Sequence, residues 1–138
     1  MIKQDTAQPR DQVAERAARA LDRCVLGPAE IPEGMRAFME DLVATLLRAG
    51  LDLCDVTDGL PEEAGVMLAP TGGPAGAAVR VIWHQHRFAD PLGETWRTEQ
   101  AAMYARLRAV LAAQGYWMGR DDGNAPTVFG SRRPSFWA

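Results

Sequence analysis

The strongest structural signal in this sequence is a pair of hairpin signatures on either side of one long helical segment. Residues 77–86, AAVRVIWHQH, have the composition and alternation of a β-strand, and a glycine-rich turn, TGGPAG, precedes them. A shorter strand segment, AGVMLAP, lies before that turn. Further along, YWMGRD and PTVFGS flank DDGNA, whose Asp-Gly-Asn run is typical of a tight turn. Strands joined in this way pair antiparallel, which argues against a doubly wound nucleotide-binding fold.

Three segments carry apolar residues at helical spacing and therefore predict helices. Asp90 is the expected N-cap of the third helix, and Pro91 is its expected first residue. The second helix is the most apolar, and its methionines, Met35 and Met39, either pack in the core or line an adaptable binding groove. Core packing is the favoured interpretation. The three predicted helices cover residues 9–26, 32–49 and 91–114.

The order of elements is therefore α-α-β-β-α-β-β. We expect one α+β domain over residues 1–138, in which an antiparallel sheet of four or five short strands is covered by helices on one face. Residues 51–60, LDLCDVTDGL, are either a short edge strand or an irregular loop. Residues 1–8 and 134–138 are expected to be flexible tails.

Composition excludes several classes of function. The chain has 138 residues, of which 47% are hydrophobic and 24% charged, so it is a globular rather than a disordered chain. Its net charge is −3 and Lys3 is its only lysine, so no overall positive field attracts nucleic acid or an anionic membrane. Neither a signal peptide nor a membrane span is apparent. The two cysteines form no paired motif, so a cytoplasmic location with reduced thiols is expected.

The two histidines form the sharpest candidate for an enzymatic site. His84 and His86 project from the same face of a strand, so both imidazoles could bind a divalent transition metal, with Asp90 as a third ligand. Two ligands make a weak motif, however. Asp90 already has a role as a helix cap, and Arg87 would oppose a cation. The sequence therefore favours no cofactor, and a metal-dependent enzyme is the alternative.

Other catalytic motifs are weaker. Cys24 lies on the apolar stripe of the first helix, and Cys54 lies between Asp52 and Asp55, whose charges raise a thiol pKa. Residues 69–76, APTGGPAG, are rich in glycine but lack the lysine and hydroxyl of a phosphate-binding loop, and a strand follows them. A hairpin loop explains this segment better than a nucleotide site.

Two surfaces carry residue types that are common where proteins bind partners. The first is the sheet face left free by the helices, with one of Tyr116 or Trp117 as an added aromatic. The second is the C-terminal tail, whose aromatics could equally pack on the domain's own core. Arginine and aromatics on an open sheet can also bind nucleic acid, but the negative charge and the lack of a basic stripe argue against it. The sheet face carries Arg80, Ile82, His84 and His86, and the tail carries Arg132, Arg133, Phe136 and Trp137.

Residues 79–118 resemble small uncharacterised proteins encoded on actinobacterial mobile elements. The resemblance rests on a Val-x-Val-x-Trp-x-x-His strand followed by a helix that ends at a glycine before an aromatic residue. No known activity comes with it. The order of elements is also similar to that of type III secretion chaperones and related small binding proteins, which implies a fold but no function. The matching residues are Val79, Val81, Ile82, Trp83, His86, Gln100, Met103, Leu107, Leu111, Gly115 and Tyr116.

We therefore expect a non-catalytic accessory or adaptor protein that acts through protein–protein binding. Its partner is either another protein or a second copy of the same chain, which would make it a homodimer. The alternative is a small enzyme that uses the His84 and His86 pair with a carboxylate such as Asp90.

Overall fold

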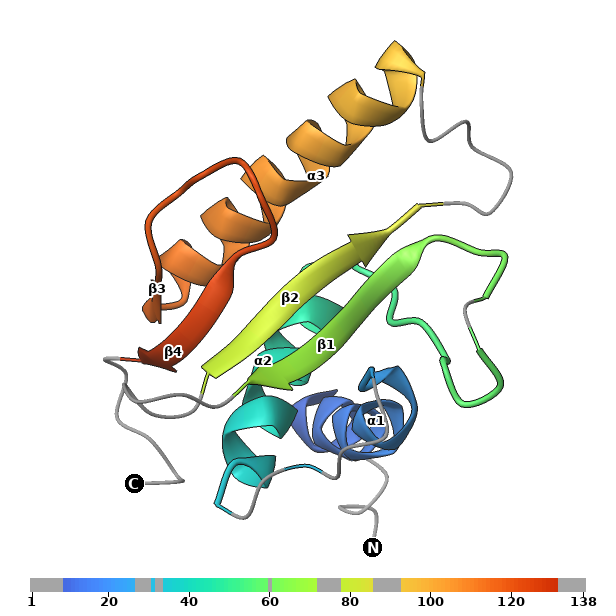
Figure 1. Ribbon diagram of the computed structural model, residues 1–138. Coiled ribbons are helices and arrows are strands. Elements are labelled where there is room, and N and C mark those ends of the chain that lie inside the picture. Colours follow the sequence, from blue (N-terminus) through green and yellow to red (C-terminus); the bar gives the residue numbers. More distant parts are fainter. Residues whose placement is uncertain are drawn as a thin grey trace, which may run out of the picture.

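The fold is seen in a computed structural model that describes residues 9–26, 31, 34–59, 61–71, 78–85 and 93–131. This part of the chain contains three helices and four strands in the predicted order (Figure 1). The fold class predicted from the sequence is therefore confirmed. The elements are α1 (Pro9–Cys24), α2 (Arg36–Arg48), β1 (Gly65–Thr71), β2 (Ala78–His84), α3 (Glu94–Ala113), β3 (Tyr116–Met118) and β4 (Thr127–Ser131).

The four strands form one antiparallel sheet in the order β1-β2-β4-β3. The two hairpins predicted from the sequence are present, and β2 and β4 join them through the pair Val79 and Val128 and the pair Arg80 and Thr127. Between Trp117 and the next residue of β3 the pairing with β4 slips by one position. The sheet has four strands, within the predicted four or five.

All three helices contribute to a core on one face of the sheet. Val79 and Val81 of β2 are fully buried on this face, and Leu107 and Leu111 of α3 belong to the same cluster. Figure 1 shows α1 and α2 behind the sheet, while α3 lies along β2 and the β3–β4 hairpin. Residues from every helix and strand join this cluster, so the described part of the chain shares one hydrophobic core.

Helix α2 is the most deeply buried helix, as its apolar face predicts. Met39 is fully buried and Met35 is 8% exposed, so both methionines pack in the core. The binding-groove interpretation of these methionines is therefore wrong. The buried residues of α2 are Phe38, Met39, Leu42, Val43, Ala44, Thr45 and Leu46.

Two predicted helix starts are corrected. Helix α2 begins at Arg36 rather than at residue 32, and α3 begins at Glu94 with Gly93 as its N-cap. No side-chain hydrogen bond caps either helix. The prediction that Asp90 caps α3 is thus wrong, and Asp90 itself lies outside the described residues. An Asp-Pro pair expresses only a local preference, whereas packing against the sheet decides where a helix of marginal propensity begins.

Of the two alternatives for residues 51–60, the described residues 51–59 form an irregular loop rather than a strand of the sheet, and this loop lies against the edge of β1. Leu53 makes an isolated parallel bridge with Val66 of β1, and Val25 makes another with Leu68. The carbonyl oxygens of Val66 and Leu68 accept backbone hydrogen bonds of 2.9 and 2.8 Å from these two flanking segments. The outer edge of β1 is therefore occupied by the chain itself, which blocks the addition of another strand there.

Among the helices of the described residues, none combines the length and the apolar character that crossing a lipid bilayer requires.

Candidate functional site

The sheet has a second face that turns away from the helices (Figure 1). Because side chains alternate along a strand, the residues beside the buried valines of β2 point to this face, and the strand register adds their cross-strand neighbours. We call this set the open sheet face. It consists of Met67 and Ala69 of β1, Arg80, Ile82 and His84 of β2, Trp117 of β3 and Thr127 of β4.

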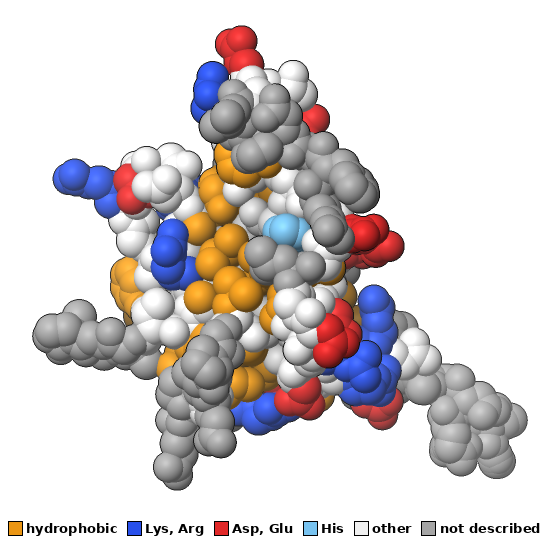
Figure 2. All heavy atoms as spheres, turned by 45° about the vertical axis from the view of Figure 1, so that its right-hand side comes forward, with side chains coloured by type: hydrophobic (Ala, Val, Ile, Leu, Met, Phe, Trp, Pro, Cys, Tyr) orange, Lys and Arg blue, Asp and Glu red, His pale blue; other side chains and the backbone are white. Residues whose placement is uncertain are grey.

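Aromatic side chains are exposed at one side of the open sheet face. Trp117 is 49% exposed, and Phe129, at the edge of this face on β4, is 53% exposed. They are the large hydrophobic side chains that stand out as exposed in the described part of the chain. Phe129 lies two residues along β4 from Thr127, the cross-strand partner of Arg80. Figure 2 shows hydrophobic side chains gathered in the middle of this side of the molecule, interrupted by basic ones.

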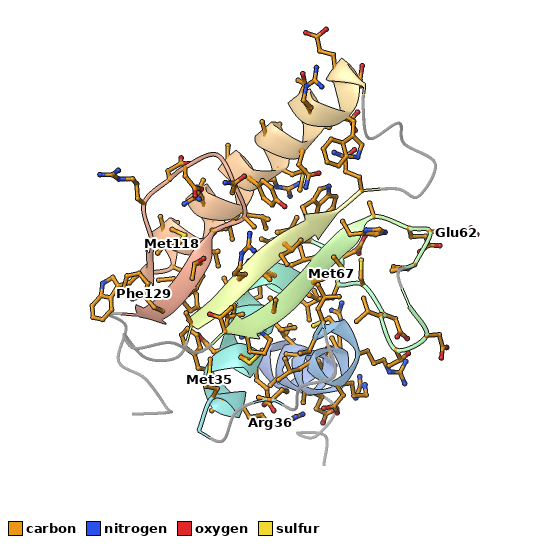
Figure 3. The ribbon with its side chains drawn as sticks, viewed as in Figure 1. Met35, Arg36, Glu62, Met67, Met118 and Phe129 are labelled. Carbon is orange, nitrogen blue, oxygen red and sulfur yellow. The ribbon has the colours of Figure 1, made fainter. Side chains whose placement is uncertain are left out.

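The opposite side of the face is more enclosed. Met67 on β1 is only 5% exposed, whereas Phe129 projects outward beyond β4 (Figure 3). His84, at the end of β2, is half-buried, and its Nε2 lies 2.8 Å from the carbonyl oxygen of Pro61. The segment that follows residue 60 is thus tied to the His84 end of the sheet. The accessible part of the open sheet face runs from Ile82 and Arg80 toward Trp117 and Phe129.

Trp117 is held on this face by the residue before it. Tyr116 is buried, and its hydroxyl donates a hydrogen bond to Asp41 and lies 3.3 Å from the Thr45 hydroxyl. Its ring also packs edge-on against Phe38, with centroids 6.0 Å apart. Since Tyr116 is anchored in the core, the adjacent indole must point to the other face of β3.

Gly130, opposite Trp117 on β4, makes room for the indole. A Cβ atom at Gly130 would lie 2.8 Å from Cε3 of Trp117, closer than such contacts allow. The missing side chain lets the indole lie across β4. Trp117 is therefore exposed, while the anchored Tyr116 sets the position of its backbone, which lowers the entropy that a binding contact would cost.

Arg80 supplies the positive charge of the open sheet face. Its side chain is exposed, and no ion pair or hydrogen bond joins the guanidinium group to another residue in the described ranges. Arg36, by contrast, lies 2.9 Å from both Asp22 and Glu40. None of the seven residues of the open sheet face is Asp or Glu, so within this set no carboxylate compensates the charge of Arg80.

The structure bears on one of the three residues predicted to bind metal. Since a carbonyl oxygen only accepts, Nε2 of His84 is the donor in its bond to Pro61. His86 and Asp90 lie outside the described residues, so the predicted set of His84, His86 and Asp90 stays a prediction. Within the described ranges, no three His, Cys, Asp or Glu residues come together in a way that could hold a metal ion.

A hollow of about 580 Å³ lies between α1 and the segment that runs along the edge of β1. Its lining includes Arg16 and Arg19 of α1 and, from the neighbouring segment, Asp52, Cys54 and Glu63. Charges of both signs thus face this hollow, and it favours no single ligand charge. The arginines and carboxylates that line it are exposed surface groups.

Both cysteines are free and buried, and burial is the main cause of their shifted pKa values. Burial raises the pKa of the Cys24 thiol from 9.0 to about 12. Burial, followed by the charges of Asp52 and Glu63, raises the pKa of Cys54 to about 11. The sequence correctly indicated Asp52 as a cause, but Asp55 is not one. Asp55 instead accepts hydrogen bonds from Thr57.

We expect both thiols to resist Ellman's reagent at mildly alkaline pH in the folded protein and to react at once in denaturant. The reactive thiolate is scarce below the raised pKa values, and both sulfur atoms are shielded. The raised pKa values stabilise the fold fully below the ordinary value of 9.0, and this contribution disappears as pH rises through about 11 to 12. Fast reaction of either thiol in the folded protein would contradict this assignment.

Some of the binding residues predicted from the sequence share the open sheet face, and others lie outside the described residues. Arg80, Ile82 and His84 share one face as predicted, and of the two aromatics considered, Trp117 joins them while Tyr116 is buried. Phe129 was not predicted, although its position next to the apolar Val128 in a strand was a usable signal. The remaining candidates, His86, Arg132, Arg133, Phe136 and Trp137, lie outside the described residues.

Comparison of the chain with protein-family models, with curated proteins and with solved structures finds no match. A function must therefore be argued from the open sheet face itself.

Proposed function

We propose that this chain is a small cytoplasmic accessory or adaptor protein that binds a protein partner through the open sheet face and catalyses no reaction. One observation carries the proposal: Trp117 and Phe129 are about half exposed beside the exposed Arg80, whose guanidinium group pairs with no other described residue. Tryptophan and arginine are the residue types most enriched among the contacts that dominate binding energy, and aromatic residues in general are enriched at interfaces.

The surroundings of these residues support the proposal. The buried Tyr116 sets the backbone position of Trp117, and the missing side chain at Gly130 lets the indole ring of Trp117 lie across β4. Rigid aromatic contacts of this kind bind with little loss of conformational freedom. The two free, buried thiols support the cytoplasmic part of the proposal, because reduced cysteines are typical of that compartment.

A pull-down with two matched variants tests the proposal. The first variant carries Trp117→Ser and Phe129→Ser, and the control carries Ala102→Ser and Ala109→Ser on the exposed side of α3. We expect wild type and control to retain the same partner from lysate of the native host, and the aromatic variant to lose at least about 90% of it, as loss of a dominant contact requires. Quantitative mass spectrometry measures the retained partner, and melting temperatures verify that all three proteins are folded.

Equal retention of every partner by the aromatic variant and the control would contradict the proposal. The same result would follow if binding depended only on the hollow beside α1. An Arg16→Glu variant, which alters that hollow and leaves the sheet untouched, distinguishes the two surfaces.

The C-terminal tail belongs to the same proposal, since Arg132, Arg133, Phe136 and Trp137 combine the same residue types. We expect deletion of residues 134–138 to weaken partner binding and to leave the melting temperature within about 2 °C of wild type. A large drop in melting temperature would instead assign these aromatics to the protein's own core.

The alternative function, a metal-dependent enzyme that uses His84, His86 and Asp90, has a separate test. Elemental analysis of the purified protein would reveal a stoichiometric transition metal, and zinc or iron would then raise the melting temperature. We expect neither result, because the Nε2 of His84 is already bonded to the carbonyl oxygen of Pro61.

A further inference from the structure

We infer that the partner of the open sheet face is an acidic protein segment, which presents a carboxylate to Arg80 and apolar side chains to Ile82, Trp117 and Phe129. This inference rests on the proposed function, because it names the chemistry of the partner that the open sheet face binds. Three features of the face carry it: the position of Arg80, the lack of Asp or Glu among the seven residues of the face, and the apolar side chains beside Arg80.

Arg80 lies in the middle of the face rather than at its rim. Its cross-strand neighbours are Ala69 on β1 and Thr127 on β4, both of them uncharged. Ile82, the next residue of β2 on this face, is half-buried. Any partner that covers the apolar side chains must therefore also cover the guanidinium group.

Covering Arg80 removes it from water, and a buried charge without a counter-charge is strongly destabilising. The chain supplies no acceptor for it within the described residues. A carboxylate of the partner can accept two parallel hydrogen bonds from the guanidinium group, which offsets the loss of hydration. A partner without an acid at this position would leave the charge unpaired, so Arg80 selects for acidic segments.

A second copy of the chain fits this requirement poorly. A two-fold dimer through the open sheet face would bring two copies of Arg80 into one interface to which neither face adds an Asp or Glu. Pairing through the edge of β1 is also blocked, because Leu53 and Val25 already occupy that edge. The charge of the face therefore favours a different, acidic protein.

Nucleic acid is the other polymer that could pair with arginine and stack on aromatics. Its affinity, however, comes mainly from several cations that follow the phosphates. Arg80 is the one Lys or Arg among the seven residues of the open sheet face. A single cation surrounded by apolar side chains suits a carboxylate within an apolar segment better than a phosphate chain.

A charge-reversal selection tests the inference. A random peptide library displayed on phage is selected on the full chain in four forms: wild type, Arg80→Glu, the control Arg16→Glu, and the double variant Trp117→Ser, Phe129→Ser. We expect wild type and control to enrich peptides that combine Asp or Glu with Leu, Phe or Trp. The Arg80→Glu form should enrich Lys and Arg instead, and the aromatic variant should enrich no common pattern.

The dissociation constant of a synthetic copy of the peptide most enriched on wild type then measures how much Arg80 contributes to binding. We expect it to bind wild type about 30-fold more tightly than Arg80→Glu, the loss expected of a dominant contact. Replacing its acids by amides should weaken binding to wild type by a similar factor, and it should strengthen binding to Arg80→Glu because it removes the repulsion between carboxylates.

The outcomes separate this inference from the proposed function. If wild type and Arg80→Glu enrich the same peptides and the aromatic variant loses them, the acidic partner is excluded and binding through the face stands. If no form enriches peptides, or all four enrich the same ones, the acidic partner and binding through the open sheet face are both excluded. A dimer by light scattering at high micromolar concentration that Arg80→Glu disrupts would identify a second copy as the partner. Tighter binding of oligo(uridine) than of the peptide would identify nucleic acid, and either result would overturn the inference.

Discussion

Replacing Gln100 by leucine is expected to destabilise the protein by about 2–3 kcal/mol, because it breaks the polar contacts between α3 and β2. The Nε2 group of Gln100 donates to the backbone oxygen of Trp83 and to the hydroxyl of Tyr104, both at 2.9 Å. Its Oε1 atom accepts a 2.7 Å bond from Gln85, a side chain that is only 7% exposed. Leucine would leave all three groups without these partners in a largely buried place.

The loss of stability caused by Gln100→Leu should be largest in the first half of α3. The fully packed residues of this helix, Tyr104, Leu107 and Leu111, all lie in its second half. The first half is mostly exposed, and the bonds of Gln85 to the backbone oxygen of Trp96 and to Gln100 attach it to the end of β2. Hydrogen exchange should therefore speed up more in the first half of α3 than in the second.

Denaturant titration measures the loss of stability, and Gln114→Leu is the matched control. Gln114 is the exposed C-cap residue of the same helix, so its replacement should change stability by less than about 0.5 kcal/mol. Equal stability of the two variants, or a uniform change in exchange along α3, would contradict the role given to Gln100.

Replacing Gly65 by alanine should cost about 2–3 kcal/mol, because no space exists for a side chain at the start of β1. A Cβ atom there would lie 2.8 Å from Sγ of Cys54, 3.1 Å from the backbone oxygen of Asp52 and 3.2 Å from the backbone nitrogen of Cys54. All three atoms belong to the segment that bridges the edge of β1, and two of them are backbone atoms. The added methyl group must push that segment away.

Gly119→Ala is the control for this substitution. Gly119 has nothing within 4 Å of the added atom, and its backbone does not need a positive φ. Besides the difference in melting temperature, Gly65→Ala should make Cys54 react faster with Ellman's reagent, since the displaced segment carries that thiol. If both alanine variants are equally stable and Cys54 stays unreactive, the edge of β1 is not held as closely as described.

Local sequence patterns predicted most of the fold. The alternation in β2 placed Val79 and Val81 in the core and Arg80 on the other face, and the tight-turn residues placed the β3–β4 hairpin. In that turn, the side chains of Asp121 and Asp122 accept hydrogen bonds from the backbone two residues further on. Such signals act within a few residues, so a single sequence contains them in full.

The helix starts and the segment after α2 were not predictable in the same way. An Asp-Pro pair indicated a start at residue 91, but α3 begins at Glu94, where Gly93 enters the helix from an extended conformation. The alternatives for residues 51–60 were a strand or a loop, and the structure contains isolated bridges from this segment and from Val25 to the edge of β1. These choices depend on residues far apart in the sequence, which local propensity does not contain.

The sequence by itself determined that the chain forms an α+β domain with helices on one sheet face, and that Arg80, Ile82 and His84 share the other. These properties follow from the period of apolar residues, which is a local property of the chain. Only the tertiary structure decided which aromatics reach that face. The bonds of Tyr116 with α2 turn Trp117 outward, and the slipped pairing of β3 with β4 accompanies the exposed Phe129. Both depend on contacts between distant segments, and these contacts exist only once the core has formed.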